Sequence, residues 1–275
     1  MPHSPLITYR GAHFIRSRER LPAHRVAAGL CAGLLLSLLQ LAGSSNVARA
    51  THEIFSPIVN RGEVEVEGRG HLDLDHRAAR DKSSEDELKL GYGVTDFWSL
   101  AVEGEWEKEP GEAVNFKETA FQNVVQMVPQ GKYPVDMGLF FEYAIADDKK
   151  SADDIAFGPI FQTRLRRVLI TMNPFFEREV GRHAGGGTIF KYGVQARYRF
   201  GPVFEPGIEA FGEPGEIGHF EGVSAQTHQI GPVGFGQFGF GRAGVVKYEL
   251  GMLLGLTRAS PDATLKAALE YEFRF

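Results

Sequence analysis

Residues 63–75 read EVEVEGRGHLDLD, and this stretch decides the fold class. Ionisable side chains occupy its odd positions, while valine, leucine or glycine occupies the even ones. Successive side chains of a β-strand point to opposite faces, whereas a helix would mix the two sets around its circumference. The stretch therefore predicts an extended strand with one apolar face and one ionisable face.

The same alternation recurs along the chain and predicts an all-β protein of about twelve strands. The clearest further segments are 98–106, 133–145, 157–165, 190–200, 246–254 and 265–275. Weaker ones are 88–92, 115–128, 168–179, 203–211 and 227–238. Strands of about ten residues are long enough to cross a bilayer at a tilt, and they exceed the usual globular strand of about 5–6 residues.

The connectors between these segments alternate in length. Longer polar or glycine-rich connectors are expected at 76–84, 108–113, 146–152, 178–187, 212–226 and 257–262. Tighter ones are expected at 93–96, 129–131, 166–167, 201–202 and 239–242. Outer-membrane barrels have short periplasmic turns and longer outer loops, so the alternation favours a single closed, antiparallel, up-and-down transmembrane β-barrel.

Four prolines lie inside predicted strands, at Pro159, Pro174, Pro206 and Pro232. Each removes a hydrogen-bond donor from a sheet that has no free edge. We expect β-bulges at these positions.

The charge of the chain argues against nucleic acid as a partner. The first fifty residues hold six basic residues and one acidic residue, which leaves 24 basic against 34 acidic residues in the rest, a net charge of −10. Phosphates would be repelled along most faces of such a body.

The N-terminal fifty residues have the layout of a secretory signal peptide. An apolar run at 26–43 follows a basic stretch at 16–25, and Ala48-Arg49-Ala50 follows it as a small-x-small cleavage site. We expect residues 1–50 to be removed and residues 51–275 to form the barrel; a retained membrane anchor is the alternative. Cys31, the only cysteine, lies in the run, so the exported chain would contain no disulfide.

The end of the chain resembles the C-terminal signature of Gram-negative outer-membrane proteins. Tyr271, Phe273 and Phe275 alternate up to the last residue, as in the signal that the barrel-assembly machinery recognises. The resemblance implies a bacterial outer-membrane location, with outer-membrane lipid and that machinery as partners. A soluble secreted sandwich with a terminal phenylalanine is the alternative.

Two shorter stretches carry a second resemblance. YGVTDFW at 92–98 and MGLFFEY at 137–143 are similar to segments of poorly characterised proteobacterial outer-membrane channels, such as the family associated with phenol-degradation pathways. This resemblance covers pieces of strand and turn only. It implies a barrel fold and a transport role, and it brings no catalytic residues.

The inward-facing charges predict how such a barrel would act. The predicted acidic wall of the lumen comprises Glu63, Glu65, Glu67, Asp73, Asp75, Glu103, Glu105 and Glu107. The predicted basic wall comprises Arg164, Arg166, Lys191, Arg197 and Arg199. Opposed walls create a transverse field suited to a passive channel for small polar or charged solutes. The same charges could instead pair across a closed structural barrel.

An outer-membrane hydrolase is the remaining alternative. His71, Asp73, Asp75 and His76 lie near the outer end of the first strand, with Ser83 close by in sequence, but no nucleophile motif surrounds them. His219 and His228 match no metal-ligand spacing. We therefore expect no enzymatic activity, no metal and no cofactor.

Overall fold

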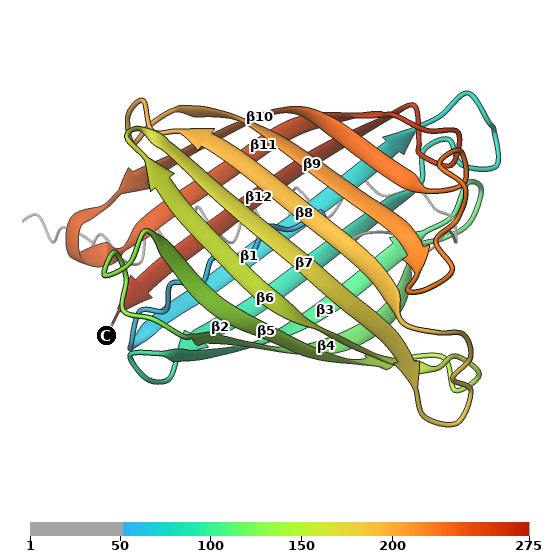
Figure 1. The fold of residues 1–275 in the computed structure, drawn as a ribbon, viewed down its shortest axis with the longest axis horizontal. Coiled ribbons are helices and arrows are strands. Elements are labelled where there is room, and N and C mark those ends of the chain that lie inside the picture. The colour runs from blue at the N-terminus through green and yellow to red at the C-terminus, as the bar shows by residue number, and fades with distance from the viewer. Residues whose placement is uncertain (1–51, 275) are drawn as a thin grey trace, which may run out of the picture.

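The computed structural model describes residues 52–274 as one closed barrel of twelve antiparallel strands, each hydrogen-bonded to its neighbours in sequence, with β1 pairing β12 (Figure 1). The strands are β1 (Glu63–Leu74), β2 (Ser84–Gly93), β3 (Trp98–Lys108), β4 (Asn115–Gln126), β5 (Val135–Ala146), β6 (Asp153–Leu165), β7 (Val168–Val180), β8 (Ile189–Tyr198), β9 (Glu205–Glu216), β10 (Thr227–Gly239), β11 (Val245–Gly255) and β12 (Ala263–Arg274). The predicted fold class and strand number are confirmed. The expected signal peptide and Phe275 lie outside the described residues.

The two ends of the barrel differ in their connectors. One end, here called the turn end, holds the start of β1, the end of β12 and the connectors 94–97, 127–134, 166–167, 199–204 and 240–244. The other, the loop end, holds the connectors 75–83, 109–114, 147–152, 181–188, 217–226 and 256–262. Connectors 127–134 and 199–204 are longer than the sequence predicts, because β4 and β8 end earlier and β5 and β9 begin later than expected.

Helix contributes little to the described part of the chain. Its one helical element is a 3₁₀ turn, η1 (Gly241–Ala243), in the connector between β10 and β11. Between residues 52 and 274 no helix has the length and apolar character needed to cross a membrane.

The outer face of the barrel is apolar, as the alternation predicts. Leu90 on β2 and Leu250 on β11 are 56 % and 60 % exposed, whereas their inward neighbours Lys89 and Glu249 point into the lumen. In lipid such a sheet must close on itself, because every backbone N–H and C=O group needs a partner. The closure of the sheet and its apolar exterior are therefore both suited to a lipid environment.

The prolines do not produce the expected bulges. The ladders of β6 with β7 and of β10 with β11 lose several pairs around Pro159, Pro174 and Pro232, but the register is the same on both sides of each gap. Among the described strands the register shifts at Glu105/Trp106 and at Phe190/Tyr192 instead. The missing proline donors thus open the ladder locally without adding a residue to either strand.

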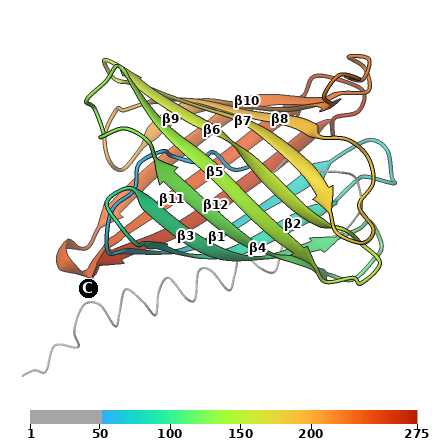
Figure 2. The same cartoon turned by 60° about the horizontal axis from the view of Figure 1, so that its bottom comes forward.

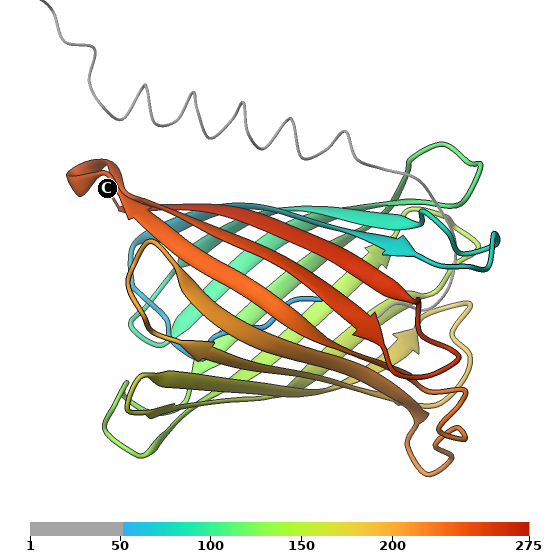
Figure 3. The same cartoon turned by 90° about the horizontal axis from the view of Figure 1, so that it is seen from above.

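The chain enters β1 through the barrel interior. Residues 52–60, here called the inner segment, run through the lumen to the turn end, where β1 begins (Figures 2 and 3). Ile54 packs on Phe211, Val233, Phe235 and Leu253 on one side of the lumen. Phe55 packs on the other side, with its ring centroid 4.3 Å from that of Phe140 and 5.8 Å from that of Phe175. The apolar core of the barrel is therefore built around this segment.

Polar contacts also fix the inner segment. The Phe55 N–H donates to Asn173 Oδ1 at 2.7 Å, and Asn173 Nδ2 donates to the Phe55 carbonyl at 3.1 Å. The Val59 N–H donates to Gln126 Oε1 at 2.9 Å. A Cβ atom at Gly193 would lie 2.6 Å from Ile54 Cδ1, so glycine in the wall makes room for the segment.

Candidate functional site

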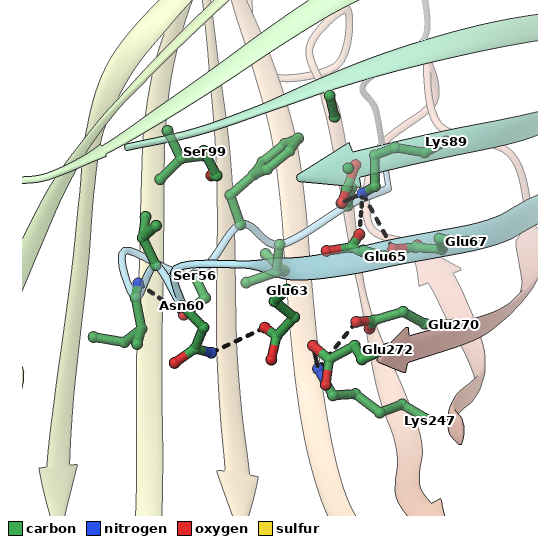
Figure 4. Close-up of a pocket in the computed structure, with 18 of the residues that line it drawn as sticks. Ser56, Asn60, Glu63, Glu65, Glu67, Lys89, Ser99, Lys247, Glu270 and Glu272 are labelled. Carbon is green, nitrogen blue, oxygen red and sulfur yellow. Dashed lines mark hydrogen bonds and ion pairs between the residues drawn. The ribbon is translucent and has the colours of Figure 1, made fainter. Parts of the chain in front are cut away.

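The barrel encloses a cavity of about 550 Å³ that extends from the middle of the lumen to the turn end. Asn60, Glu63 and Arg199 line it near the turn end, and Glu53 of the inner segment lines it in the middle. Figure 4 shows charged side chains from several strands pointing into this space. We call this space the vestibule, and it is the candidate functional site.

Strand β1 supplies carboxylates to one side of the vestibule. Glu65 and Glu67 alternate with outward residues, and Lys89 of β2 lies between them and the inner segment (Figure 4). Lys89 Nζ lies 3.1 Å from Glu67 Oε2 and 3.5 Å from Glu65 Oε1, and it also pairs with Glu53. Arg69 also lines this side, with Nη2 2.5 Å from Glu67 Oε1. Two cations thus serve three carboxylates, which leaves this side negatively charged when the carboxylates are ionised.

Strands β11 and β12 extend the acidic side. Lys247 Nζ lies 3.0 Å from Glu270 Oε1 and also pairs with Glu272. The Lys247 side chain is 34 % exposed, and those of Glu270 and Glu272 are 18 % and 17 % exposed. These groups therefore contact the space of the vestibule and are accessible to a solute there.

Arginines lie on the far side of the vestibule, on and after β8. This strand is five positions from β1 around the ring. Arg199 Nε lies 2.5 Å from Glu205 Oε1, and Arg197 pairs with the other oxygen of the same carboxylate. Arg197 also lies over the Phe235 ring, 4.8 Å from its centroid. Two guanidinium groups share one carboxylate, so this side carries net positive charge.

The other residues of the predicted basic wall do not join this surface. Arg164 is exposed at the end of β6, and Arg166 is exposed in the turn 166–167 with a φ of 57°. Lys191 lies deeper, where its Nζ is 2.6 Å from Glu177 Oε2 and 3.8 Å from Glu213 Oε2. Side-chain alternation fixes which face a residue occupies but not its depth along the axis, so the sequence could not separate these positions.

The predicted acidic wall is likewise divided along the axis. Glu63, Glu65 and Glu67 line the vestibule. The remaining members lie elsewhere: Glu103 and Glu105 are buried in the wall of β3, Glu107 is half-buried towards the loop end, and Asp73 and Asp75 are buried at the loop end of β1.

The loops that flank β1 and β12 are tied together at the loop end by the pair His76–Asp262 and by Arg77. Arg77 pairs with Asp75 of its own loop and donates to the Ser260 carbonyl of the other at 2.7 Å. Hydrogen bonds from Arg77 lower the pKa of Asp75, and hydrogen bonds from His76 lower the pKa of Asp262. His76 Nδ1 lies 2.8 Å from Asp262 Oδ2, and the His76 N–H donates to the same oxygen at 2.8 Å. The connectors 75–83 and 256–262 are therefore joined where the barrel closes.

The hydrolase alternative finds no support in the arrangement of the rim. The Ser83 hydroxyl donates to the Arg80 carbonyl at 2.9 Å and to Asp73 Oδ2 at 3.3 Å, not to a histidine. His71 is buried with its ring centroid 4.6 Å from that of His52 on the inner segment. A nucleophilic serine needs a base within hydrogen-bond reach, and these groups do not provide one to Ser83.

His219 and His228 do not share a loop, because His228 lies on β10. His228 Nδ1 lies 2.9 Å from the Tyr192 hydroxyl, and His228 Nε2 lies 2.7 Å from Gln226 Oε1. His219 is exposed in the connector 217–226. The contacts of His228 are those of a hydrogen-bonded surface histidine.

Two residues of the predicted assembly signature lie on the outer face. Tyr271 and Phe273 stack with ring centroids 5.2 Å apart, and the Tyr271 hydroxyl donates to the Ala243 carbonyl in η1. Phe275 lies outside the described residues.

The inner segment is the functional feature that the sequence analysis missed. Its sequence, HEIFSPIVN, has no sustained alternation. The proline and the mixture of apolar and polar residues give no signal that separates it from an ordinary linker between a signal peptide and a first strand.

No protein-family model matches the sequence, and no curated protein sequence matches it. Several solved structures are similar in shape. The COG4313 outer membrane channel from Pseudomonas putida F1 is 12 % identical with a TM-score of 0.56, covering 83 % of this chain and 100 % of that chain. The NanC porin is 8 % identical with a TM-score of 0.53, covering 76 % and 100 %. At these identities the likeness establishes the fold: this chain folds as the closed antiparallel barrel that these outer-membrane channels share.

Proposed function

We propose that this protein is an outer-membrane channel through which small polar or charged solutes pass passively. The observation that carries the proposal is the vestibule, a cavity of about 550 Å³ inside a closed barrel with an apolar exterior. Small solutes require such a polar, hydrated space within the membrane. The fold shared with the COG4313 channel and the NanC porin supports the same role.

The charges around the vestibule suggest how solutes are selected. Glu65 and Glu272 lie on the acidic side, while Arg197 and Arg199 lie on the other. A solute with separated positive and negative groups would align in the field between them. We therefore propose small zwitterionic or charged solutes as the preferred class.

The orientation follows from the connectors. In the proposed arrangement the loop end faces outwards and the turn end, with the vestibule, faces the periplasm. Export by a signal peptide at 1–50 and recognition of the terminal aromatics by the barrel-assembly machinery are parts of this proposal.

Planar-bilayer conductance and liposome swelling test the function together. We expect discrete conductance steps from the purified protein, and faster swelling with a zwitterionic amino acid than with an uncharged sugar of similar size. Replacing both Arg197 and Arg199 by glutamine should reduce that preference, because one side of the field is removed. No current above the lipid background at low or high salt would overturn the channel.

A closed structural barrel is the second candidate, and the inner segment favours it. The segment packs on both sides of the lumen and borders a small space of about 30 Å³, whose lining includes Phe55, Phe140 and Phe175. A barrel of this kind would conduct only after the inner segment is removed. Current from a variant without residues 52–60, together with none from the wild type, would support this second role.

A further inference from the structure

Three buried carboxylates meet where the inner segment passes β2 and β3. Glu53 comes from the inner segment, Glu87 from β2 and Glu103 from β3, and they are 7 %, 5 % and 3 % exposed. One carboxylate oxygen of each lies within 4.8 Å of one from each of the others. The residues are thus brought together by three separate parts of the chain.

The partners of these carboxylates leave two oxygens unused. Glu53 Oε1 pairs with Lys89, and Glu103 Oε1 accepts a hydrogen bond from Gln122 Nε2 at 3.2 Å. Glu53 Oε2 and Glu103 Oε2 are buried and have no hydrogen-bond partner among the described residues. A buried carboxylate oxygen without a partner is costly, so the arrangement calls for a further positive group.

Neighbouring basic groups do not supply it. Lys89 already serves Glu53, Glu65 and Glu67. Arg69 approaches two of the three carboxylates only at long range, with Nη2 3.9 Å from Glu53 Oε1 and Nε 3.7 Å from Glu87 Oε2. Its close contact is with Glu67, whose Oε1 lies 2.5 Å from Nη2. Both cations are thus shared with the acidic side of the vestibule, and negative charge remains in excess around the three carboxylates when they are ionised.

We propose that Glu53, Glu87 and Glu103 bind a calcium ion. Ca²⁺ takes oxygen ligands at about 2.3–2.6 Å in flexible geometry, and Mg²⁺ requires a tighter octahedron at about 2.0–2.1 Å. Oxygen atoms within 4.8 Å of one another can surround one ion at the calcium distance. The absence of nitrogen and sulfur from this ligand set disfavours softer transition metals.

The ion would fasten the inner segment to the barrel wall. Glu53 lines both the vestibule and the small space on its far side, so the site lies where the two spaces are separated. Calcium bound here would connect the segment to β2 and β3 through one carboxylate from each. The site is proposed independently of conduction, and its binding test does not depend on the channel being open.

Isothermal titration calorimetry on the full barrel, purified in detergent and freed of metal with EDTA, tests the site. We expect one Ca²⁺ per chain, with weaker Mg²⁺ binding. Glu53→Gln and Glu103→Gln should each weaken Ca²⁺ binding at least about tenfold, because ligand charge sets affinity in such sites. Calcium should also raise the unfolding temperature of the wild type but not that of the variants.

Glu105→Gln is the matched control. Glu105 lies two residues from Glu103 on the same face of β3 and is also buried, but its carboxylate pairs with Lys117. Calcium binding should survive this substitution. Glu53→Gln lies outside the barrel strands, so it keeps the test decisive if a strand variant fails to fold. No Ca²⁺ binding by the wild type, or equal binding by Glu53→Gln, would overturn the proposal and would indicate that a shared proton balances the carboxyl groups.

Discussion

The vestibule and the middle of the lumen are built from the same alternating strands, yet some of their charged side chains differ in their exposure to solvent. In the vestibule the side chains of Glu65, Lys247 and Arg199 are 31 %, 34 % and 38 % exposed. In the middle, Lys266 and Glu209 are 1 % and 0 % exposed and lie 2.6 Å apart. The inner segment makes the difference, because it excludes solvent from one region and only borders the other.

This difference decides what an inward charge can do. An ion pair that remains in contact with water contributes about 0–1 kcal/mol and can exchange its partner for a solute. A buried pair is held in place, since removing one partner costs about 3–5 kcal/mol. The exposed charges of the vestibule, Glu65, Lys247 and Arg199, are therefore available for selection. Its buried pair Lys89–Glu67 and the pair Lys266–Glu209 of the middle hold the structure together instead.

Removal of residues 52–60 should have the largest effect, because it abolishes the difference between the two regions. The deletion joins the vestibule to the space on its far side, so single-channel conductance should rise severalfold and ion selectivity should fall. Planar-bilayer recordings measure both. Ser56→Ala is the control, because Ser56 is exposed and its hydroxyl accepts the N–H of Ile58, two residues along the same segment, at 3.2 Å. Unchanged conductance after the deletion would show that the inner segment does not restrict the pore.

Lys266→Met should be the most destabilising single substitution in the middle of the lumen. Lys266 Nζ lies 2.6 Å from Glu209 Oε2, from Glu249 Oε1 and from the His52 carbonyl. Its loss leaves the buried Glu209 without a cationic partner and Glu249 with only Arg69, at 3.5 Å, so the free energy of unfolding should fall by about 3–5 kcal/mol. Denaturant unfolding of the barrel in detergent measures this.

Lys247→Met is the comparison from the vestibule. Lys247 also pairs with two carboxylates, but its side chain is one-third exposed. The expected loss is about 0–1 kcal/mol. Equal losses for Lys247→Met and Lys266→Met would mean that the two regions do not differ in the way described here.

Asn173→Ala should loosen the inner segment at a smaller cost in stability than that of Lys266→Met. The Asn173 amide makes two hydrogen bonds to the backbone of Phe55. Leaving these backbone groups unpaired costs about 1–3 kcal/mol, so protease cleavage within residues 52–60 should become faster. Thr171→Ala on the same face of β7 is the control, because Thr171 bonds to Gln162 of the wall instead. Equal cleavage of the two variants would contradict the role of Asn173.

Much of the barrel could be predicted from the sequence, because the residues of a membrane strand alternate between an apolar face towards lipid and a polar face towards the lumen. Residues 63–75 predict a strand and its two faces, and β12 repeats the pattern with Leu265, Leu269 and Tyr271 facing outwards. The closed architecture follows from the recurrence of such segments and from the alternating connector lengths. The weaker segments also form strands, as predicted. Pairing with neighbours on both sides, rather than their own pattern, determines their conformation.

The site was less predictable, because depth along the axis and the path of the inner segment leave no periodic trace. Lys191 and Arg197 share a face of β8. Lys191 pairs with Glu177 towards the loop end, whereas Arg197 borders the vestibule. The inner segment is held by single side chains such as Asn173 of β7 and Gln126 of β4, which lie far apart in sequence. No local property of residues 52–60 specifies those contacts.

The smallest predicted effect lies at the loop end, outside both regions of the lumen. The pKa of Asp75 and the pKa of Asp262 are lowered by their hydrogen bonds to Arg77 and His76. A lowered carboxyl pKa gives stabilisation that is complete above the unfolded value of about 3.9 and is lost as the pH falls through the folded value. The connectors 75–83 and 256–262 should therefore stay joined at pH 5 and separate only below about pH 4.

Spin labels in the two connectors would report the separation, and Asp262→Asn should increase it at neutral pH while leaving conductance unchanged. Separation of the wild-type connectors already at pH 6 would assign the transition to a group other than these carboxylates.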